Sequence, residues 1–457
     1  MSRFNVHFIH VGNMNNKGTQ ALFCSDVNVV REIPKTEVSV SVSTPDIEGV
    51  KKLNLSLDSV LPPMVDIPYD KADQQIKAIG GERKDLRYKW YTLANLLYMF
   101  LQIPLSLFSV LFFKIGLRPF YRGEVIKCVS NSDLVISHSD ENFKETASLL
   151  PLNPIWVITW WSMLLSRTFE IIVARSLGKH VVMFPNSVGP FRTWLGRFLA
   201  KLSLNNCDTV LIRETISYDI VKRLEIRGSK ILTYDTALLY TPTHNVTRDD
   251  FLKPSLEVCP GIYSRSLSKK ETENYIDGHA KALDTAIEKY ALSVVFIPHY
   301  ISGFPHDDLD VSKLILDKME NKHQAKIVIA DGVKEFKMYL DQMDMIISSK
   351  MHPAILGATG YVPILCIVYD HKQSSFFERL DMVECTLGVR LVSYQNLLSK
   401  IDYVWQQREQ LSATLREQIP KWQKNVSEAI KSTVIPYMKI NHSLIFGDMK
   451  SQRDDEM

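Results

Sequence analysis

Lys350 and His352 lie two residues apart in the segment SSKMHPAILGATG (residues 348–360), between an apolar strand-like run and a helix. A lysine can bind an anion, and an imidazole can exchange a proton near neutral pH. Either side chain alone is equally consistent with an ordinary junction between a strand and a helix. The segment becomes a candidate active site only if other ionisable side chains meet it at the same sheet edge.

Such side chains follow the ends of many predicted strands, and in open α/β sheets ligands bind beyond the carboxyl ends of the strands. Taken singly, each of these residues could simply make a turn. Their recurrence in both halves of the chain predicts a cleft for an anionic ligand. The candidates are Asn16, Lys17, Asp140, Asn186 and Arg213 in the first half, and Arg265, His299, Lys350, His352 and Lys372 in the second.

Short apolar strands alternate with helical stretches along most of the chain. In the first half they are expected near residues 4–11, 37–43, 133–137, 180–184, 209–213 and 230–234. A polar break at 241–255 precedes a second series near 256–260, 292–298, 325–330, 344–348 and 363–369. Strands that are apolar on both faces are typical of parallel sheets.

We therefore predict an α/β protein with two Rossmann-like, doubly wound domains facing a cleft, a GT-B-like arrangement. Residues 1–245 are expected to form an acceptor-side domain and residues 255–400 a donor-binding domain. A helical segment is expected at 401–440 and a disordered tail at 446–457.

An apolar run at residues 91–113 interrupts this pattern, carries no formal charge and is long enough to cross a bilayer. Crossing would separate the first two strands from their sheet, and Pro104 should break or kink a helix. We expect a helical hairpin dipping into one leaflet beside basic neighbours; a buried insertion and a dimer contact are the alternatives. Residues 154–166 are apolar too and would extend the same surface.

The overall composition favours a soluble globular protein without a nucleic-acid partner. The 457 residues carry a formal charge of +3, too balanced to indicate a nucleic-acid surface. Six scattered cysteines form no zinc or redox motif. The first residues are too polar for a signal peptide, so a cytoplasmic protein is expected.

Five segments together resemble the polysaccharide pyruvyltransferase family. They are GNMNNKGTQAL (12–22), RETIS (213–217), PHY (298–300), DMIISSKMHPAILGATGYVPIL (344–365) and YDHK (369–372). The last two are the most specific, and the resemblance covers most of the chain in order, apart from the apolar run. Two departures are Lys350, where the family usually has arginine, and SHSDEN (137–142) in place of a glycine-rich turn.

The resemblance implies a GT-B-like fold and transfer of the pyruvyl or enolpyruvyl group of phosphoenolpyruvate to sugar hydroxyls, without a metal or further cofactor. By position it implies that Arg213, Lys350 and His352 bind the donor or act in catalysis, and His299 and Lys372 match further recurrent positions. Because lysine lacks the bidentate fork of arginine, Lys350 is expected to bind an anion as a point charge.

We assign His352 as acid and base, with Asp140 and His299 as further catalytic residues. Arg213 and Lys350 are expected on the donor anions, assisted by Arg265 and Lys372, with Asn16, Lys17 and Asn186 in the binding set. The acceptor is expected to be a polysaccharide or a lipid-linked glycan at the cytoplasmic membrane face.

Two alternative functions use the same fold. A GT-B glycosyltransferase would need a glutamate on the nucleotide ribose, for which Glu335 is the candidate. A non-catalytic scaffold of a glycan-assembly complex would explain the two departures as decay. The acceptor sugar and the oligomeric state are not determined by the sequence.

Overall fold

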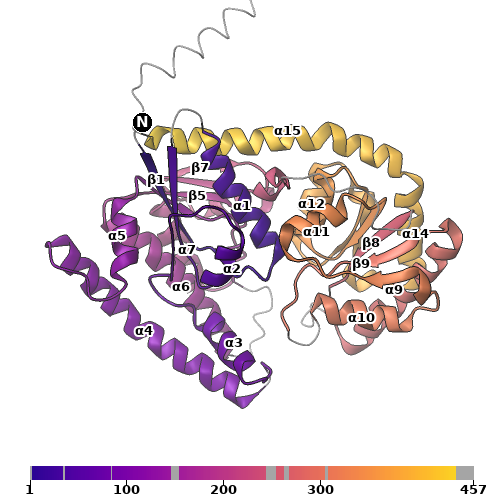
Figure 1. Cartoon of the computed structure of the whole chain (residues 1–457), viewed down its shortest axis with the longest axis horizontal. Helices are drawn as coiled ribbons and strands as arrows, with labels where there is room; N and C mark the ends of the chain where they lie inside the picture. The colour runs from indigo at the N-terminus through magenta and orange to yellow at the C-terminus, as the bar shows by residue number, and fades with distance from the viewer. Residues whose placement is uncertain are drawn as a thin grey trace, which may run out of the picture.

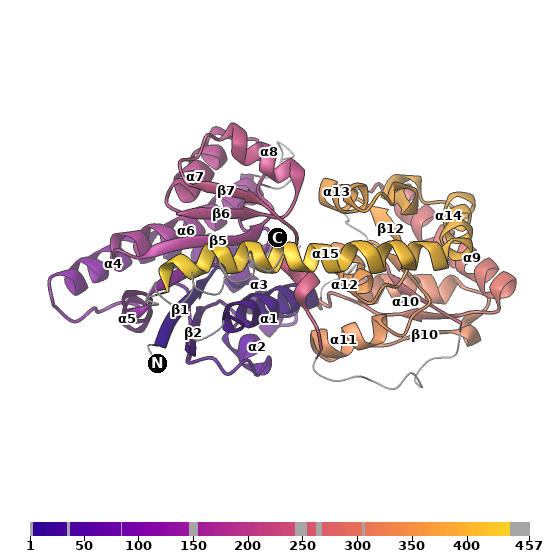
Figure 2. The same ribbon diagram turned by 90° about the horizontal axis from the view of Figure 1, so that it is seen from above.

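The computed structural model describes residues 3–33, 37–83, 85–145, 154–242, 254–261, 267–303 and 307–438. Its two parallel sheets, each flanked by helices, lie side by side, and one long helix runs across both (Figures 1 and 2). This arrangement confirms the predicted fold class. The tail predicted to be disordered lies outside the described residues.

The first sheet has seven parallel strands in the order β3-β2-β1-β4-β5-β6-β7. The strands are β1 Arg3–Ile9, β2 Glu37–Ser43, β3 Ser59–Leu61, β4 Leu134–Ser137, β5 His180–Asn186, β6 Thr209–Ile212 and β7 Ser229–Leu232. All except β3 match predicted strands. β3 was missed because it is a three-residue, half-buried edge strand, too short to show a pattern.

The second sheet has six parallel strands in the order β10-β9-β8-β11-β12-β13. The strands are β8 Ser255–Cys259, β9 Ser293–Phe296, β10 Ala325–Ile327, β11 Met345–Ser348, β12 Ile364–Val368 and β13 Thr386–Gly388. The sequence predicts the first five and misses β13, which again has only three residues.

The helices of the first domain cover both faces of its sheet. They are α1 Lys17–Arg31, α2 Ile47–Lys52, α3 Pro68–Ala78, α4 Leu86–Lys114, α5 Gly123–Asn131, α6 Pro154–Ser176, α7 Trp194–Asn205, α8 Thr215–Arg223 and the 3-10 helix η1 Thr236–Leu239. Alternate residues of β4 face opposite layers: Leu134 and Ile136 pack with Phe23 of α1, whereas Val135 belongs to the core formed with α5, α6 and α7.

The second domain has its own set of helices. They are α9 Lys269–Tyr290, α10 Asp308–Lys318, η2 Lys322–Gln324, α11 Gly332–Leu340, α12 Met351–Thr359, α13 His371–Arg379, η3 Val383–Cys385, η4 Val389–Leu391 and α14 Tyr394–Gln406. Its core is formed by the strands together with these helices.

The chain ends by returning to the first domain. α15 Arg408–Val434, followed by η5 Ile435–Tyr437, packs Leu415 and Ile419 into the second core and Val426 and Ile430 into the first. Figure 2 shows this helix lying across both sheets. The helical pattern of residues 401–440 therefore corresponds to a brace between the domains.

The apolar run predicted as a hairpin is instead one helix, and that prediction is wrong. α4 is a single 29-residue helix that contains Pro104. A proline removes one N–H donor from the helix, and long helices can accommodate this as a local kink. α4 lies on the outside of the first domain against α3, α5 and α6 (Figure 1).

Candidate active site

The carboxyl ends of both sheets meet where α1 begins. Asn16 is the N-cap of α1, and its side-chain Oδ1 accepts hydrogen bonds from the N–H groups of Gly18 at 2.8 Å and Thr19 at 3.4 Å. The Lys17 Nζ donates to the carbonyls of Pro298 and His299 at 3.2 and 3.4 Å, across the domain boundary. The first turn of α1 is therefore held against the end of β9.

His352, in the first turn of α12, lies directly against this turn. Its ring stacks on that of His299, with centroids 6.0 Å apart and planes 24° apart. Burial lowers the pKa of both imidazoles, and the pKa of His299 falls well below the usual value for histidine. For His352, the nearby carboxylate of Asp235 opposes the effect of burial, and the charge of Arg213 adds to it. The His352 Nε2 and both His299 ring nitrogens have no hydrogen-bond partner within the described parts of the chain.

Gly18 leaves the space that His352 occupies. A Cβ on this glycine would lie 2.1 Å from the His352 Nδ1, closer than non-bonded atoms approach. We expect Gly18→Ala to displace the imidazole and to lower turnover about 10²-fold, since a small misplacement of a reacting group can cost that much. Steady-state kinetics with a thermal unfolding control test this, and Gly388→Ala is a matched control because a Cβ there would make only an ordinary contact, with Leu391 Cδ1 at 3.6 Å. Unchanged kcat would contradict it.

Arg213, at the end of β6, is a buried cation of the first domain. Its Nε donates to Ser187 Oγ and its Nη1 to Asp235 Oδ2, both at 2.8 Å. Burial disfavours the charged guanidinium, but the carboxylates of Asp235 and Glu214 outweigh it and raise its pKa. Arg213 therefore stays charged, although only 3% of its side chain is exposed.

Lys350, the N-cap residue of α12, is the corresponding cation of the second domain. Its Nζ lies 3.1 Å from the buried Asp308 Oδ1. Burial raises the pKa of Asp308, although the lysine charge opposes this. A Cβ on Gly261 would lie 2.6 Å from the Lys350 Cε, so glycines make room for both ionisable side chains of the 350–352 segment.

Glu141 lies among cations from both domains. Its carboxylate contacts Lys144, contacts Lys372 of α13, and lies 3.9 Å from the Arg213 Nη2. Burial lowers the pKa of Lys372 to about 8. Glu141 therefore balances part of the positive charge that the two domains bring together.

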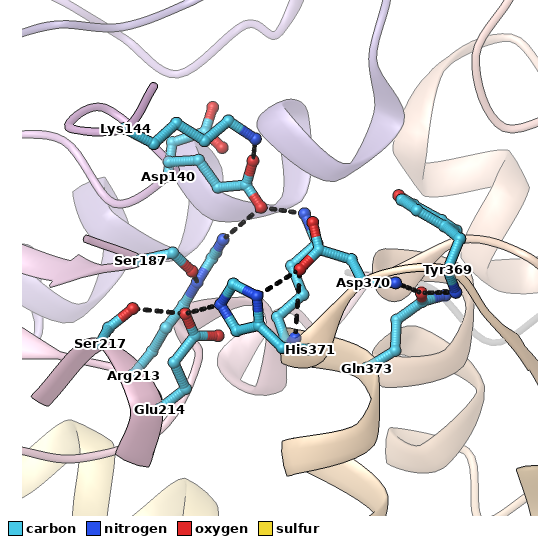
Figure 3. A network of polar contacts seen from close by, with 12 residues as sticks. Asp140, Lys144, Ser187, Arg213, Glu214, Ser217, Tyr369, Asp370, His371 and Gln373 are labelled. Atoms are coloured by element: carbon cyan, nitrogen blue, oxygen red, sulfur yellow. Dashed lines mark hydrogen bonds and ion pairs between the residues drawn. The ribbon is translucent and has the colours of Figure 1, made fainter. Parts of the chain in front are cut away.

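A histidine links α13 to the first domain beside this cluster. The Nδ1 of His371 lies 2.8 Å from Asp370 Oδ1, and its Nε2 lies 3.7 Å from Glu214 Oε1 (Figure 3). Hydrogen bonds to Asp370 and then to Glu214 raise the pKa of His371 to about 10, although burial opposes them. The imidazole is thus a cation at neutral pH.

We expect His371 to make stability depend on pH in the alkaline range. Because its pKa in the folded protein is raised from 6.5 to about 10, its contribution is fully present below pH 6.5 and is lost as pH rises through 10. Urea unfolding of the wild type and His371→Gln should give a stability difference that shrinks between these values. His323→Gln, at an exposed position, is the control; a difference independent of pH would refute this.

Asp140, in the turn after β4, lies among charged side chains of the first domain. Burial raises its pKa, but the charges of Arg213 and His138 outweigh this effect, so its pKa falls below the usual value. Its Oδ2 is 3.5 Å from Thr19 Oγ1 of α1. Asp140 is therefore an ionised acceptor at the cleft wall.

Behind Asp140 is a buried pair that the sequence did not single out. The His138 Nδ1 lies 2.7 Å from the Asp26 Oδ2, and Asp26 also accepts from the N–H and hydroxyl of Ser139. This network fixes the turn after β4 that carries Asp140 and Glu141. The only feature of the sequence that indicates this network is Asp26, a single acidic residue within the apolar face of α1.

The predicted residues thus divide into two groups. His352, His299, Arg213, Lys350, Lys372 and Asp140 converge at the cleft. Asn16 and Lys17 fix the start of α1. Asn186 is fully buried, and its amide donates to the carbonyls of His138 and Phe184. These three residues therefore position the backbone. Arg265 lies outside the described residues.

The sequence gave no role to the acids that balance the predicted cations. Glu141 and Asp235 lie beside Arg213, and Asp308 lies beside Lys350. His371, which also had no assigned role, is a further cation and contacts Glu214. Each stands in or next to a segment already noted, for instance His371 within YDHK. The sequence gives no sign of which acid pairs with which cation.

Together these features define a two-domain, GT-B-like α/β protein in which cationic and histidine side chains of both domains lie near one another. A family model described as polysaccharide pyruvyl transferase matches residues 34–371. The chain belongs to this family, which confirms the family resemblance of its motifs.

One curated relative and two solved structures illustrate the similarity. The amylovoran biosynthesis protein AmsJ of Erwinia amylovora is 21% identical over 248 residues, which is 51% of this chain and 60% of AmsJ. UDP-GlcNAc 2-epimerase from Neisseria meningitidis, bound to UDP-GlcNAc, has a TM-score of 0.56 at 11% identity, covering 95% of this chain and 100% of that chain. The S. aureus MnaA–UDP structure gives 0.53 at 13% identity, covering 96% of each. At these identities the two structures show the fold alone.

Proposed function

We propose that this protein transfers the pyruvyl or enolpyruvyl group of phosphoenolpyruvate to hydroxyls of a polysaccharide or lipid-linked glycan. Membership of the family supports the reaction class, and the name of AmsJ supports a role in polysaccharide biosynthesis. Phosphoenolpyruvate is a co-substrate, and the proposal needs no metal or other cofactor. The reaction takes place on the cytoplasmic side of the membrane.

The observation that carries the proposal is the convergence of cations from both domains on His299 and His352, whose buried ring nitrogens His299 Nδ1, His299 Nε2 and His352 Nε2 have no hydrogen-bond partner in the described part of the chain. Phosphoenolpyruvate carries a phosphate and a carboxylate, which several cations can bind by charge-assisted hydrogen bonds. Arg213 enters from the first domain, and Lys350 and Lys372 from the second. The buried acids Asp235 and Asp308 hold two of these charges in place before the donor binds.

The proposed reaction begins when a general acid protonates the methylene carbon of the donor, leaving positive charge on the adjacent carbon. An acceptor hydroxyl attacks that carbon and gives its proton to His352. Because burial lowers the His352 pKa, the imidazole is neutral and able to accept this proton. Asp140, on the opposite wall, orients the acceptor.

Two products can follow from this intermediate. Loss of phosphate and of a methyl proton gives an enolpyruvyl ether. Attack by a second hydroxyl of the same sugar on the same carbon, with loss of phosphate, gives a cyclic ketal. The spacing of the two hydroxyls on the acceptor decides between them.

The proposal is tested by incubating the full chain with phosphoenolpyruvate and glycans extracted from cell membranes. We expect acceptor-dependent phosphate release and a glycan that gains one pyruvyl unit by mass spectrometry. Lys350→Ala should abolish both, whereas Lys334→Ala, away from the described contacts of the cleft, should not. Phosphate release without glycan modification would refute transfer.

A ligand-binding measurement separates the two enzyme classes. We expect phosphoenolpyruvate to raise the thermal unfolding midpoint and nucleotide sugars not to, since only a ligand that binds the folded state stabilises it. Glu335 is the candidate for the glutamate that a glycosyltransferase would need on the nucleotide ribose. Its carboxylate accepts from the Asp331 N–H at 2.5 Å and contacts the Tyr339 hydroxyl. Stabilisation by nucleotide sugars alone would favour a glycosyltransferase.

A further inference from the structure

Most apolar side chains of α4 point away from the protein. This helix is long and apolar enough to cross a membrane, yet only 28% of its most apolar window is buried. We define the α4 surface by six large exposed side chains: Trp90, Leu97, Phe100, Leu101, Phe108 and Leu111. Exposure of Leu97 reaches 64% and of Trp90 61%. Soluble proteins rarely expose so continuous an apolar face without a partner.

The opposite face of α4 contains several polar side chains that make specific contacts with the protein, together with the buried Met99 and Val110. The Gln102 amide and Asp66 exchange two hydrogen bonds of 2.9 Å, and the Ser109 hydroxyl donates to the Tyr121 carbonyl at 2.8 Å. Nearer the start of the helix, Asn95 donates to Gln75 of α3 at 2.7 Å. The helix thus buries a mixture of polar and apolar groups while most of its large apolar side chains are exposed, unlike an ordinary surface helix, whose exposed face is polar.

We propose that the α4 surface docks onto an anionic lipid membrane, with the helix lying in the plane of the interface. Contacts to α3, α5 and α6 hold the helix along its length, so it could span a bilayer only by leaving the domain. At 1.5 Å per residue its 29 residues extend about 43 Å, a length that can lie along a membrane interface.

The charges around this surface favour anionic lipid. The chain contains no aspartate or glutamate between residues 86 and 123, where Arg87, Lys89, Lys114 and Arg118 are exposed. Basic residues near the headgroups add to membrane affinity. A second copy of the chain docked symmetrically on the same face would instead bring these like charges together.

A neighbouring helix shows the same combination of residues. In α7, Trp194 is 72% and Phe198 55% exposed, and Arg197 and Lys201 lie beside them. No acidic residue occurs between positions 171 and 207. Both views place α6 between α4 and α7 (Figures 1 and 2). Aromatic and basic side chains together are typical of interfacial membrane helices.

An apolar cavity opens beside the α4 surface. It has a volume of about 250 Å³ and lies between α3, α4 and α6. Leu86, Trp90, Leu93, Leu96 and Ile158 provide most of its apolar lining. A cavity of this composition suits the hydrocarbon chain of a membrane lipid. Membrane docking does not depend on the proposed reaction, so either proposal can fail without the other.

Vesicle flotation of the full chain tests the docking surface. We expect binding to vesicles of phosphatidylcholine mixed with phosphatidylglycerol, weaker binding to phosphatidylcholine alone, and a decrease at high salt because salt screens the charges. Leu97→Glu and Phe108→Glu should each lower binding by about tenfold or more, because each variant loses the favourable free energy of moving a large apolar side chain from water into the membrane. Leu391→Glu, at an exposed position of the second domain, is the matched control.

Further measurements keep the test decisive. Arg87→Glu combined with Lys114→Glu should lower binding only to the anionic vesicles, and circular dichroism should show all variants folded. Quenching of tryptophan fluorescence by brominated lipid should be reduced in Trp90→Phe. The proposal would be overturned if the wild type did not bind vesicles. It would also be overturned if the protein were a dimer that Leu97→Glu converts to a monomer, which would assign the surface to another copy of the chain.

Discussion

Replacing His352 with glutamine is expected to lower kcat by about 10²–10⁴-fold, the usual contribution of a positioned acid or base. The imidazole is buried at the meeting point of the two sheets, its Nε2 has no hydrogen-bond partner among the described residues, and Gly18 leaves it room. Because glutamine cannot accept a proton near neutral pH, the loss should appear in kcat more than in the KM for phosphoenolpyruvate.

The pH profile makes this prediction specific to a proton-transfer role. Because burial lowers the His352 pKa from 6.5, the wild type should keep its activity at pH 6.5 and lose it at more acidic pH. That acid limb should disappear in His352→Gln. His323→Gln should leave both kcat and the profile unchanged. A glutamine variant with wild-type kcat would remove His352 from the mechanism.

Replacing Arg213 with methionine is expected to lower the free energy of unfolding by about 3–5 kcal/mol, because it leaves a buried charge uncompensated. The unpaired group would be Asp235, which is 4% exposed and bonded to Arg213 at 2.8 Å. Urea unfolding measures this loss. Arg390→Met is the control, since 69% of that side chain is exposed and surface pairs contribute about 0–1 kcal/mol.

A double variant separates the structural role of Arg213 from donor binding. Arg213→Met with Asp235→Leu removes both charges and should recover much of the stability. Its affinity for phosphoenolpyruvate, measured by calorimetry, should remain at least about tenfold weaker than that of the wild type, which corresponds to about 1.4 kcal/mol. Wild-type affinity in the double variant would show that Arg213 only supports the fold.

The two-sheet architecture is readable in the sequence because parallel strands buried on both faces are continuous apolar runs. Eleven strands were predicted, and the two that were missed, Ser59–Leu61 and Thr386–Gly388, have three residues each. At that length a chain shows no periodicity. Arg213 and His352 follow strands of four residues, Thr209–Ile212 and Met345–Ser348, which are apolar enough to be recognised in the sequence.

The hairpin prediction for residues 91–113 shows where sequence reasoning was wrong. That prediction treated Pro104 as a break between two helices, but the helix continues through it. Gln102, Ser106 and Ser109 are buried against the rest of the domain. Such contacts join residues far apart in sequence. A hydropathy pattern cannot show which face of a helix these contacts bury.

By itself, the sequence determined the fold class, the family and the segment that carries Lys350 and His352, because strand patterns and motifs are local in the chain. Only the tertiary structure decided how their charges are balanced: Asp235 faces Arg213, Asp308 faces Lys350, and Glu141 faces Lys372. It also revealed that Gly18 makes room for His352 and that α4 exposes its apolar side. Charge pairing and burial depend on distances in space, which the order of residues does not fix.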